Sequence, residues 1–304
     1  MAIHCVRQPV IIMGMARSGT SLIAGLLHRL GLFLGHRKIL EDEEAKFFYR
    51  LNQIMLRRIH GEFDNPAPMR YMLDDPNAVD TTVRCLEADV KSYRIISYLG
   101  LRQYLKYRAL ARYDKPWGWK DPQNIYTLPL WLKLFPRAKI VYIVRNGVDV
   151  ASSLVNLQSK IIYMRQIRNE KRSGKFSLRR NIELFGFKGA VRCLSLEGSF
   201  SLWEEYVSQA EETLAGLDNA QKTIQYEKFL ADPKPHLIDL LRFCELRESP
   251  DLVIDDFAKR VHSGRSNAFL SDPRLVSFYD KVKNNHWMMH YGYSREYDLP
   301  SAAD

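Results

Sequence analysis

A short turn near the N-terminus contains the residue types that bind phosphate. It runs from Gly14 to Gly19, between the apolar run 10–13 and a helical pattern. Glycine lets the backbone approach a bulky anion, and the N–H groups and partial positive charge of the first helical turn attract it. We therefore predict an anion-binding loop at this turn. Its residues are Arg17, Ser18, Gly19, Thr20 and Ser21.

The cation of this turn is not where the common nucleotide-triphosphate loop has it. That loop, G-x-x-x-x-G-K-[ST], has a lysine directly after its second glycine, where this chain has Thr20. The cation is instead Arg17, before the glycine. We also find no apolar strand ending in an aspartate that would hold magnesium, which argues against a kinase. A P-loop kinase acting on a small substrate is the first alternative function.

The hydrophobic pattern predicts three junctions at which a strand is followed by a helix. The strands are predicted at 10–13, 140–144 and 223–226, and the helices at 20–30, 148–157 and from about 227. Residues 140–144 are apolar on both alternations, as in a parallel strand that helices cover on both faces. Alternating strands and helices predict an α/β fold with a mainly parallel sheet flanked by helices. The three junctions should then share one crevice beyond the carboxyl ends of the strands.

The rest of the chain gives weaker signals. Helices are predicted over 43–59 and, as one long or two shorter basic helices, within 81–113, and a short strand is predicted in 117–122. Between residues 160 and 192, ten lysines and arginines face only Glu170 and Glu183, which indicates a basic insertion or lid over about 158–195. If this region binds polyanions without catalysis, which is the second alternative, binding should depend steeply on salt and not on Lys120.

The composition is typical of a large folded domain. The chain has 304 residues, 46% of them hydrophobic and 26% charged, with a formal net charge of +10. This length can bury a sizeable core, and we predict one domain over residues 1–304. The positive charge favours an anionic partner, such as a nucleotide, an acidic acceptor, nucleic acid or a membrane surface, without choosing among them.

The cysteines and the first apolar segment bear on the compartment. The four cysteines are far apart and form no C-x-x-C pair, which indicates neither a zinc site nor a disulfide framework. The first apolar segment is interrupted by Arg17, His28 and Arg29, unlike a signal peptide or a membrane span. We predict a cytoplasmic protein without a membrane span.

Three segments far apart in the sequence form one larger pattern. They are Met15 to Ser21, then Lys120-Asp121-Pro122, and then Phe135 to Leu154, which contains Arg145-Asn146-Gly147. In this order and spacing they resemble the sulfotransferases that use 3′-phosphoadenosine 5′-phosphosulfate (PAPS) as donor. The resemblance covers residues 8–35 and 115–157 well. It implies a P-loop NTPase-like sulfotransferase fold and transfer of a sulfuryl group to a hydroxyl, less readily an amine, of a small molecule or glycan.

The resemblance also implies which residues bind the donor. The first segment is similar to the 5′-phosphosulfate loop of the family, and the third is similar to its 3′-phosphate motif. In that motif Arg145 and, eight residues later, Ser153 would bind one phosphate. Tyr226 resembles an aromatic residue near the adenine, although a core tyrosine at the sheet edge is an equal alternative. Arg265 would lie in a late loop over the nucleotide, unless it is an ordinary surface arginine.

Catalysis needs cations at the leaving oxygen and a base for the acceptor. Fixed cations that stabilise the developing charge lower the barrier, and we choose Arg17 and Lys120 for this role, so that no metal is needed. An arginine at position 17 and the Lys120-Asp121-Pro122 segment resemble the tyrosylprotein branch, which keeps a glutamate base. That glutamate would correspond to Glu43 or Glu44, with His36 as a rival. The same acidic residues could simply compensate a helix dipole.

Two further patterns suggest other ligands only weakly. His286 and His290 have the i, i+4 spacing of metal ligands, but the apolar residues between them favour a packed segment. Four tyrosines among basic residues could stack on bases, yet their spacing is helical and no nucleic-acid-binding motif accompanies them. They are Tyr98, Tyr104, Tyr107 and Tyr113. We therefore expect no nucleic-acid partner and no metal.

Overall fold

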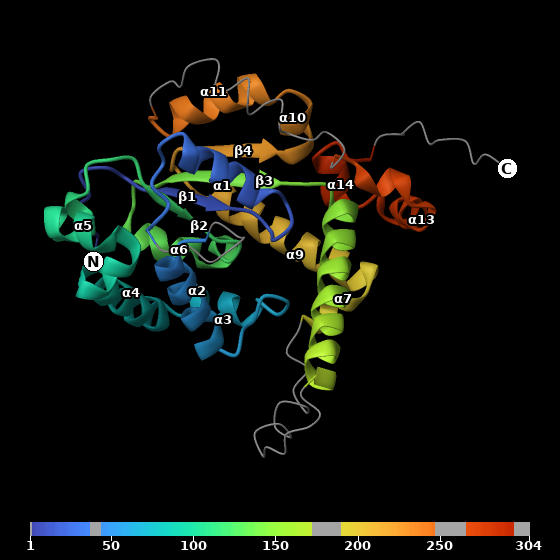
Figure 1. The fold of residues 1–304 in the computed structure, drawn as a ribbon, viewed down its shortest axis with the longest axis horizontal. Helices are drawn as coiled ribbons and strands as arrows, with labels where there is room; N and C mark the ends of the chain where they lie inside the picture. The colour runs from blue at the N-terminus through green and yellow to red at the C-terminus, as the bar shows by residue number, and fades with distance from the viewer. Residues whose placement is uncertain (1, 37–43, 172–189, 247–265, 295–304) are drawn as a thin grey trace. The chain divides into compact units, whose positions relative to one another are not determined.

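The fold is seen in a computed structural model of the chain (Figure 1). It describes residues 2–36, 44–171, 190–246 and 266–294. The chain divides into two compact units by its internal contacts. The first unit comprises Met1–Asn146 and Tyr206–Asn267, and the second comprises Gly147–Glu205 and Ala268–Asp304. That the whole chain is one domain stays a prediction.

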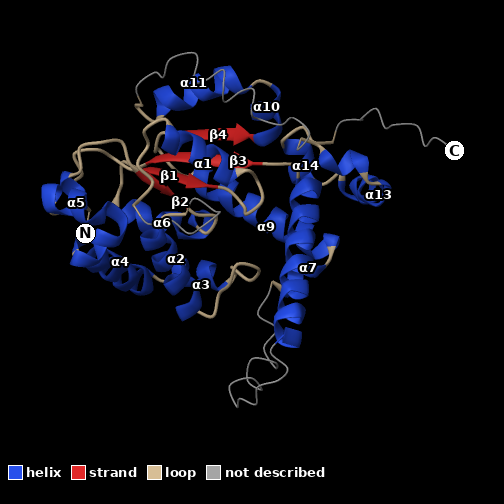
Figure 2. Cartoon of the chain, in the orientation of Figure 1, coloured by secondary structure: helices blue, strands red, loops and turns tan. Residues whose placement is uncertain are grey.

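A four-stranded sheet, drawn red in Figure 2, organises the first unit. Its strands are β1 (Val10–Met13), β2 (Gly118–Lys120), β3 (Lys139–Val144) and β4 (Gln221–Gln225). All neighbouring strands are parallel, in the order β2-β1-β3-β4. The α/β fold predicted from the sequence is confirmed, and β1 has the predicted bounds. Parallel pairing brings the carboxyl ends of all four strands to one edge of the sheet.

The helices of the first unit agree in part with the prediction. They are α1 (Thr20–Arg29), α2 (Lys46–Arg58), α3 (Pro68–Asp74), α4 (Pro76–Lys91), α5 (Ile96–Tyr107), α6 (Asn124–Leu134), α10 (Tyr226–Ala231) and α11 (Pro233–Phe243). The basic segment 81–113 forms two helices, one of the two possibilities left open. Asp74 ends α3, and α4 starts two residues later at Pro76, where the Asp75 side chain accepts the Ala78 N–H and caps the helix.

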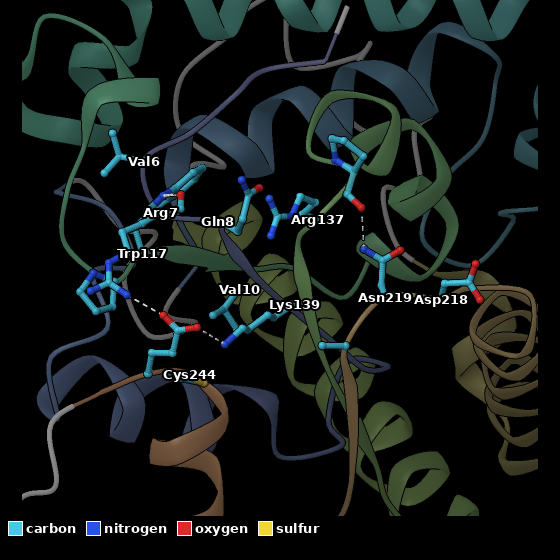
Figure 3. Close-up of a pocket in the computed structure, with 14 residues that line it drawn as sticks. Val6, Arg7, Gln8, Val10, Trp117, Arg137, Lys139, Asp218, Asn219 and Cys244 are labelled. Carbon is cyan, nitrogen blue, oxygen red and sulfur yellow. Dashed lines mark hydrogen bonds and ion pairs between the residues drawn. The ribbon is translucent and has the colours of Figure 1, made fainter.

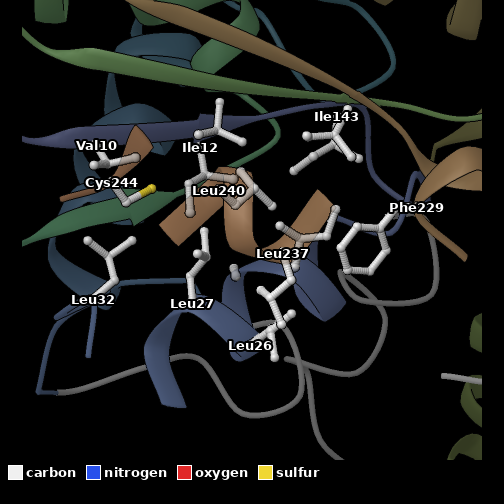
Figure 4. Close-up of a cluster of buried hydrophobic side chains, with 14 of the residues drawn as sticks. Val10, Ile12, Leu26, Leu27, Leu32, Ile143, Phe229, Leu237, Leu240 and Cys244 are labelled. Atoms are coloured by element: carbon white, nitrogen blue, oxygen red, sulfur yellow. The ribbon is translucent and has the colours of Figure 1, made fainter. Parts of the chain in front are cut away.

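One face of the sheet is covered by α1, α10 and α11 (Figure 4). Leu27 of α1 and Leu240 of α11 meet Ile12 and Ile143 of the strands, and Phe229 of α10 closes the cluster. All five side chains are buried. The apolar side chains of α1 therefore form the face that packs on the sheet.

Aromatic side chains from several elements form a second buried cluster. The ring of Phe48 on α2 stacks on that of Trp119 in β2, with centroids 4.0 Å apart and planes 7° from parallel. Trp131 of α6 meets the Trp119 ring edge-on at 5.2 Å. Nearly all of α6 is buried, so its sequence carries no amphipathic stripe, and sequence analysis did not find this helix.

The second unit is helical. Its elements include α7 (Gly147–Lys171), the first part of α9 (Leu196–Ala215), α13 (Pro273–Val282) and α14 (His286–His290). The helix predicted over 148–157 continues to Lys171, because residues 158–171 contain no glycine or proline and many good helix formers. The predicted lid thus begins as part of α7, and its residues 172–189 lie outside the described residues.

The packing of α1 on the sheet generates a stability prediction. Leu27 has no exposed surface, so Leu27→Ala should leave a cavity and lower the free energy of unfolding by about 3 kcal/mol. Urea denaturation measures the change. Val6→Ala is the control, because the Val6 side chain is 67% exposed and should cost less than about 0.5 kcal/mol. A loss at Leu27 as small as that of the control would contradict this account of the core.

Candidate active site

The turn between β1 and α1 has a backbone that only glycine allows at two positions. Gly14 and Gly19 have φ angles of 152° and 88°. A Cβ on Gly14 would lie 2.3 Å from the Ile143 carbonyl oxygen, and one on Gly19 would lie 2.2 Å from the Tyr226 ring. Both glycines are therefore required because the turn lies directly against β3 and α10. The protein itself fixes the shape of this loop.

The N-terminus of α1 is suited to an anion. No side chain caps the helix at Gly19, and the first turn contains no acidic residue. Ser18 and Thr20 are buried within the loop, while Arg17 is exposed and has a left-handed φ of 73°. First-turn N–H groups without a side-chain cap, with a cation beside them, can bind a phosphate or sulfate group.

Residues of the three strand-to-helix junctions are in contact, while the single crevice that they should share stays a prediction. Arg145, directly after β3, donates from Nη1 to the Arg17 carbonyl oxygen at 3.2 Å. Its guanidinium carbon lies 5.0 Å from the centre of the Tyr226 ring, which is itself against Gly19. Residues 17–19, 145 and 226 thus lie together at the carboxyl edge of the sheet. Tyr226 is only 3% exposed, and its contact with an adenine stays a prediction.

Two residues that the sequence singled out for catalysis form an ion pair. Lys120 Nζ lies 2.7 Å from Glu44 Oε1, and it also donates to Ser21 Oγ at 3.1 Å. Only 1% of the Lys120 side chain and 8% of the Glu44 side chain are exposed. A buried cation therefore contacts the first turn of α1 and a carboxylate at the same time.

The neighbouring carboxyl group, Asp121, is fully buried. Its Oδ1 accepts the Gln123 N–H at 2.9 Å, and its Oδ2 accepts from Asn52 Nδ2 at 2.8 Å. Burial raises the pKa of Asp121 to about 7, and the nearby Glu44 carboxylate adds to this, against the opposing effects of the two hydrogen bonds and of Lys120. Asp121 is thus a carboxyl group that titrates near neutral pH beside the catalytic candidates.

Some predicted site residues are not brought together within one unit. Glu43 and Arg265 lie outside the described residues, so that Glu44 is the glutamate the structure places. Ser153 lies half-buried on α7 of the second unit. His36, the rival base, is exposed, and its ring lies beside Gly100 of α5 rather than at Lys120.

Sequence analysis missed two polar residues that hold this region together. Glu227 is buried and accepts the Asn146 N–H at 2.9 Å, which fixes the backbone after Arg145. Asn52 is buried on α2 and bonds to Asp121. The sequence did offer a clue to Glu227, because this residue directly follows Tyr226, which was singled out at the end of the strand predicted over 223–226. Nothing in the sequence separates Asn52 from a surface asparagine.

The weaker sequence patterns have structural explanations. Tyr98, Tyr107 and Tyr113 are buried, and Tyr98 donates to the Gly118 carbonyl oxygen at 2.6 Å, so these rings are core residues. The rings of His286 and His290 lie 6.3 Å apart on α14. In the part of the chain that the structure describes, no three His, Cys, Asp or Glu side chains are grouped as metal ligands would be. Nor does any described helix have the length and hydropathy needed to cross a membrane.

A cavity of about 560 Å³ lies at the opposite edge of the sheet (Figure 3). Val10, Trp117 and Lys139, at or just before the starts of three strands, line it. Lys139 and Arg7 both form ion pairs with Glu245 there. None of the predicted site residues lines this cavity, so it and the catalytic candidates are at different edges of the sheet.

The raised pKa of Asp121 predicts a pH-dependent stability. The folded protein keeps this proton up to about pH 7, whereas the unfolded chain releases it near 3.8. The contribution of this group to the free energy of unfolding is therefore largest at low pH and falls as pH rises from about 4 to 7, by at most about 1.4 kcal/mol per pH unit. Asp121→Asn should remove that slope in denaturation experiments.

The control for this slope is Asp272→Asn. The Asp272 side chain is 31% exposed, and its pKa is lowered by the hydrogen bond from Arg274, so this variant should not remove the fall between pH 4 and 7. The slope is the readout, since asparagine at position 121 keeps only one of two acceptor oxygens and loses stability at any pH. Equal slopes in wild type and Asp121→Asn would show that the carboxyl is ionised in the folded state.

Comparison with known proteins identifies a family. Residues 9–250 match the model of the Sulfotransferase family. The chain is also similar to the sulfotransferase domain of the curacin biosynthetic pathway, at 16% identity and a TM-score of 0.47, covering 97% of this chain and 100% of that one. No curated protein sequence matches it.

Two further solved structures give similar values. The sulfotransferase STF1 of Mycobacterium tuberculosis H37Rv is 16% identical, with a TM-score of 0.42 and coverage of 85% of this chain and 71% of that one. The sulfotransferase of Alicyclobacillus acidocaldarius is 19% identical, with a TM-score of 0.38 and coverage of 86% and 95%. At such values the assignment depends on the family match. Because that match spans most of the chain, from β1 through α11, this protein belongs to the sulfotransferase family.

Proposed function

We propose that this enzyme transfers a sulfuryl group from PAPS to a hydroxyl of a small molecule or glycan. Sulfotransferase activity and PAPS as donor follow from family membership. The observation that carries the proposal for these residues is the position of Lys120. Its ammonium group contacts both Ser21, in the first turn of α1, and Glu44. A cation and a carboxylate therefore meet at the anion-binding loop.

The residues present fit the two anionic ends of the donor. The uncapped first turn of α1, with Arg17 beside it, suits the 5′-phosphosulfate. Arg145 follows β3, which pairs with β1 in the sheet. We assign the 3′-phosphate to Arg145 and Ser153. PAPS supplies the activated sulfuryl group, and this chain binds and orients it.

Lys120 and Glu44 have complementary roles in the proposed transfer. Glu44 accepts the proton of the acceptor hydroxyl as its oxygen bonds to sulfur. Lys120 and Arg17 stabilise the negative charge left on the oxygen of the 5′-phosphate when its bond to sulfur breaks. An amine acceptor would need the same base. The basic residues between 158 and 195 would suit an anionic acceptor.

Nucleotide selectivity tests the donor site. At a concentration of 100 times its Kd, 3′,5′-ADP should stabilise the protein by about 2.7 kcal/mol. ADP, or ATP with magnesium, should stabilise it much less at that same concentration. Arg145→Ala should abolish the preference because it removes the cation assigned to the 3′-phosphate. Differential scanning fluorimetry measures both effects.

Arg137→Ala is the matched control for Arg145→Ala. Arg137 is an exposed arginine at the other edge of the sheet, and its removal should leave the preference for 3′,5′-ADP unchanged. Stronger stabilisation by ATP with magnesium would favour the kinase alternative. Binding that depends on salt but not on the 3′-phosphate would favour the polyanion-binding module.

The assigned base is tested by Glu44→Gln. Glutamine keeps the size of the side chain and can still accept from Lys120, but it cannot take up a proton at neutral pH. We expect kcat to fall by about 100-fold or more, while the Kd of 3′,5′-ADP changes less than about 3-fold. Transfer rates with PAPS and isothermal titration measure the two. A variant with the kcat of the wild type would rule out Glu44 as the base.

A further inference from the structure

Three evenly spaced side chains connect α2 and the segment that enters it to the end of β2. Glu44, Phe48 and Asn52 are spaced four residues apart along the segment that enters and forms α2. They contact three consecutive residues. Glu44 pairs with Lys120, Phe48 stacks on Trp119, and Asn52 bonds to Asp121. One face of the α2 segment therefore meets every residue of the strand end that carries the catalytic lysine.

Asn52 has the most complete set of hydrogen bonds in this contact. Its Nδ2 donates to Asp121 Oδ2 at 2.8 Å and to Asn124 Oδ1 at 2.9 Å. Its Oδ1 accepts from Thr127 Oγ1 at 3.0 Å and from Trp131 Nε1 at 2.8 Å. The side chain has no exposed surface. An asparagine side chain has two N–H donors and one oxygen with two lone pairs, and all of this capacity is used.

The partners of Asn52 extend the network to the central strand. Asn124 Oδ1 also accepts the indole N–H of Trp119 at 3.1 Å, and its Nδ2 donates to the Ile12 carbonyl oxygen at 3.0 Å. The same carbonyl accepts the Asp121 N–H at 3.2 Å. Asn52 is therefore bonded to a turn that is itself held to β1, two residues before the anion-binding loop begins.

The start of α2 has no side-chain cap. The N-cap position, Ala45, makes no side-chain cap, and the first turn of α2 has no acidic residue. Glu44 lies just before this end of the helix, where its carboxylate pairs with Lys120. Because Glu44 is continuous in the chain with α2, a shift of α2 along the strand end would move its carboxylate.

We propose that Asn52 is a positioning residue that sets the separation of Glu44 and Lys120 by locking α2 to the Asp121 turn. This inference rests on the proposed function, in which those two side chains act together. Asn52 touches neither donor nor acceptor. Loss of its two donor bonds should let α2 shift and separate the base from the cation. A cost in rate rather than in donor binding should follow, because the separation matters for proton transfer.

Asn52→Asp tests the inference with the smallest change of shape. The carboxylate still accepts from Thr127 and Trp131, but it opposes Asp121 and Asn124 Oδ1 without a donor. We expect kcat to fall by about 10-fold or more at pH 8, with the Kd of 3′,5′-ADP within about 3-fold of wild type. As pH falls, a proton shared by the two carboxyls restores the bond. The ratio of variant to wild-type kcat should then rise. Glu44 and Lys120 are the other charged groups that act on Asp121.

Met55→Ala is the matched control on the same helix. Met55 is buried on α2 and has no hydrogen bond in the network, so its loss weakens packing alone. It should lower the melting temperature while leaving kcat and the pH profile of kcat as in wild type. If Asn52→Asp and Met55→Ala change kcat equally, Asn52 acts only through stability and the inference is wrong.

Crystal structures of both variants give a readout that does not depend on activity. The separation of Lys120 Nζ and Glu44 Oε1, 2.7 Å here, should exceed about 4 Å in Asn52→Asp, beyond ion-pair range, and stay unchanged in Met55→Ala. An unchanged separation in Asn52→Asp would overturn the inference even with an active enzyme. A wild type that fails to bind 3′,5′-ADP would instead overturn the proposed function alone. If Asn52→Asp does not fold, Asn52→Ser, which keeps one donor, should show the same changes to a smaller degree.

Discussion

The ion pair of Lys120 and Glu44 is almost entirely removed from water, and the arrangement of the site depends on it. Burying two charges costs several kcal/mol per ion, which their attraction offsets only when geometry is good and further hydrogen bonds are made. Ser21 provides one such bond to Lys120. In return, the pair presents a fixed cation and a fixed carboxylate in a medium of low dielectric constant, where each acts more strongly on a reacting group than it would in water.

The parallel sheet explains why residues from distant parts of the sequence reach this pair. Each strand end delivers one functional segment to the same edge: the glycine turn after β1, Lys120 at the end of β2, Arg145 after β3 and Tyr226 after β4. The loop is held in shape by contacts with its neighbours, since Gly14 lies against β3 and Gly19 lies against Tyr226. Its N–H groups are thus oriented before any anion binds. A loop of this kind loses little conformational entropy on binding.

The segments found from sequence are those whose chemistry is local. A few consecutive residues are enough to identify a glycine turn, an apolar strand or a cation at a strand end. The strands β1 and β3 and the glycine turn after β1 were predicted on that basis. The contact of Lys120 with Glu44 was not predicted as a contact, although both residues were named, because it joins positions 76 residues apart. Helix α6 was not predicted, for a reason that lies in its burial. Burial on nearly all sides removes the amphipathic period by which a helix is recognised.

Asn52 shows the limit of sequence reasoning most clearly. In the sequence it lies between Leu51 and Gln53 in an amphipathic helix, where asparagine usually faces solvent. Its importance comes from four partners that the fold assembles around one amide. Replacing a buried amide that makes all its hydrogen bonds is costly, because each of its former partners is then a buried polar group without a hydrogen bond. The same reasoning explains why polar residues persist beside the aromatic cluster of Phe48 and Trp119. Apolar side chains would fill that space, but they would make no hydrogen bonds to fix how far α2 can slide along the strand end, and the proposed roles of Glu44 and Lys120 need that position to be fixed.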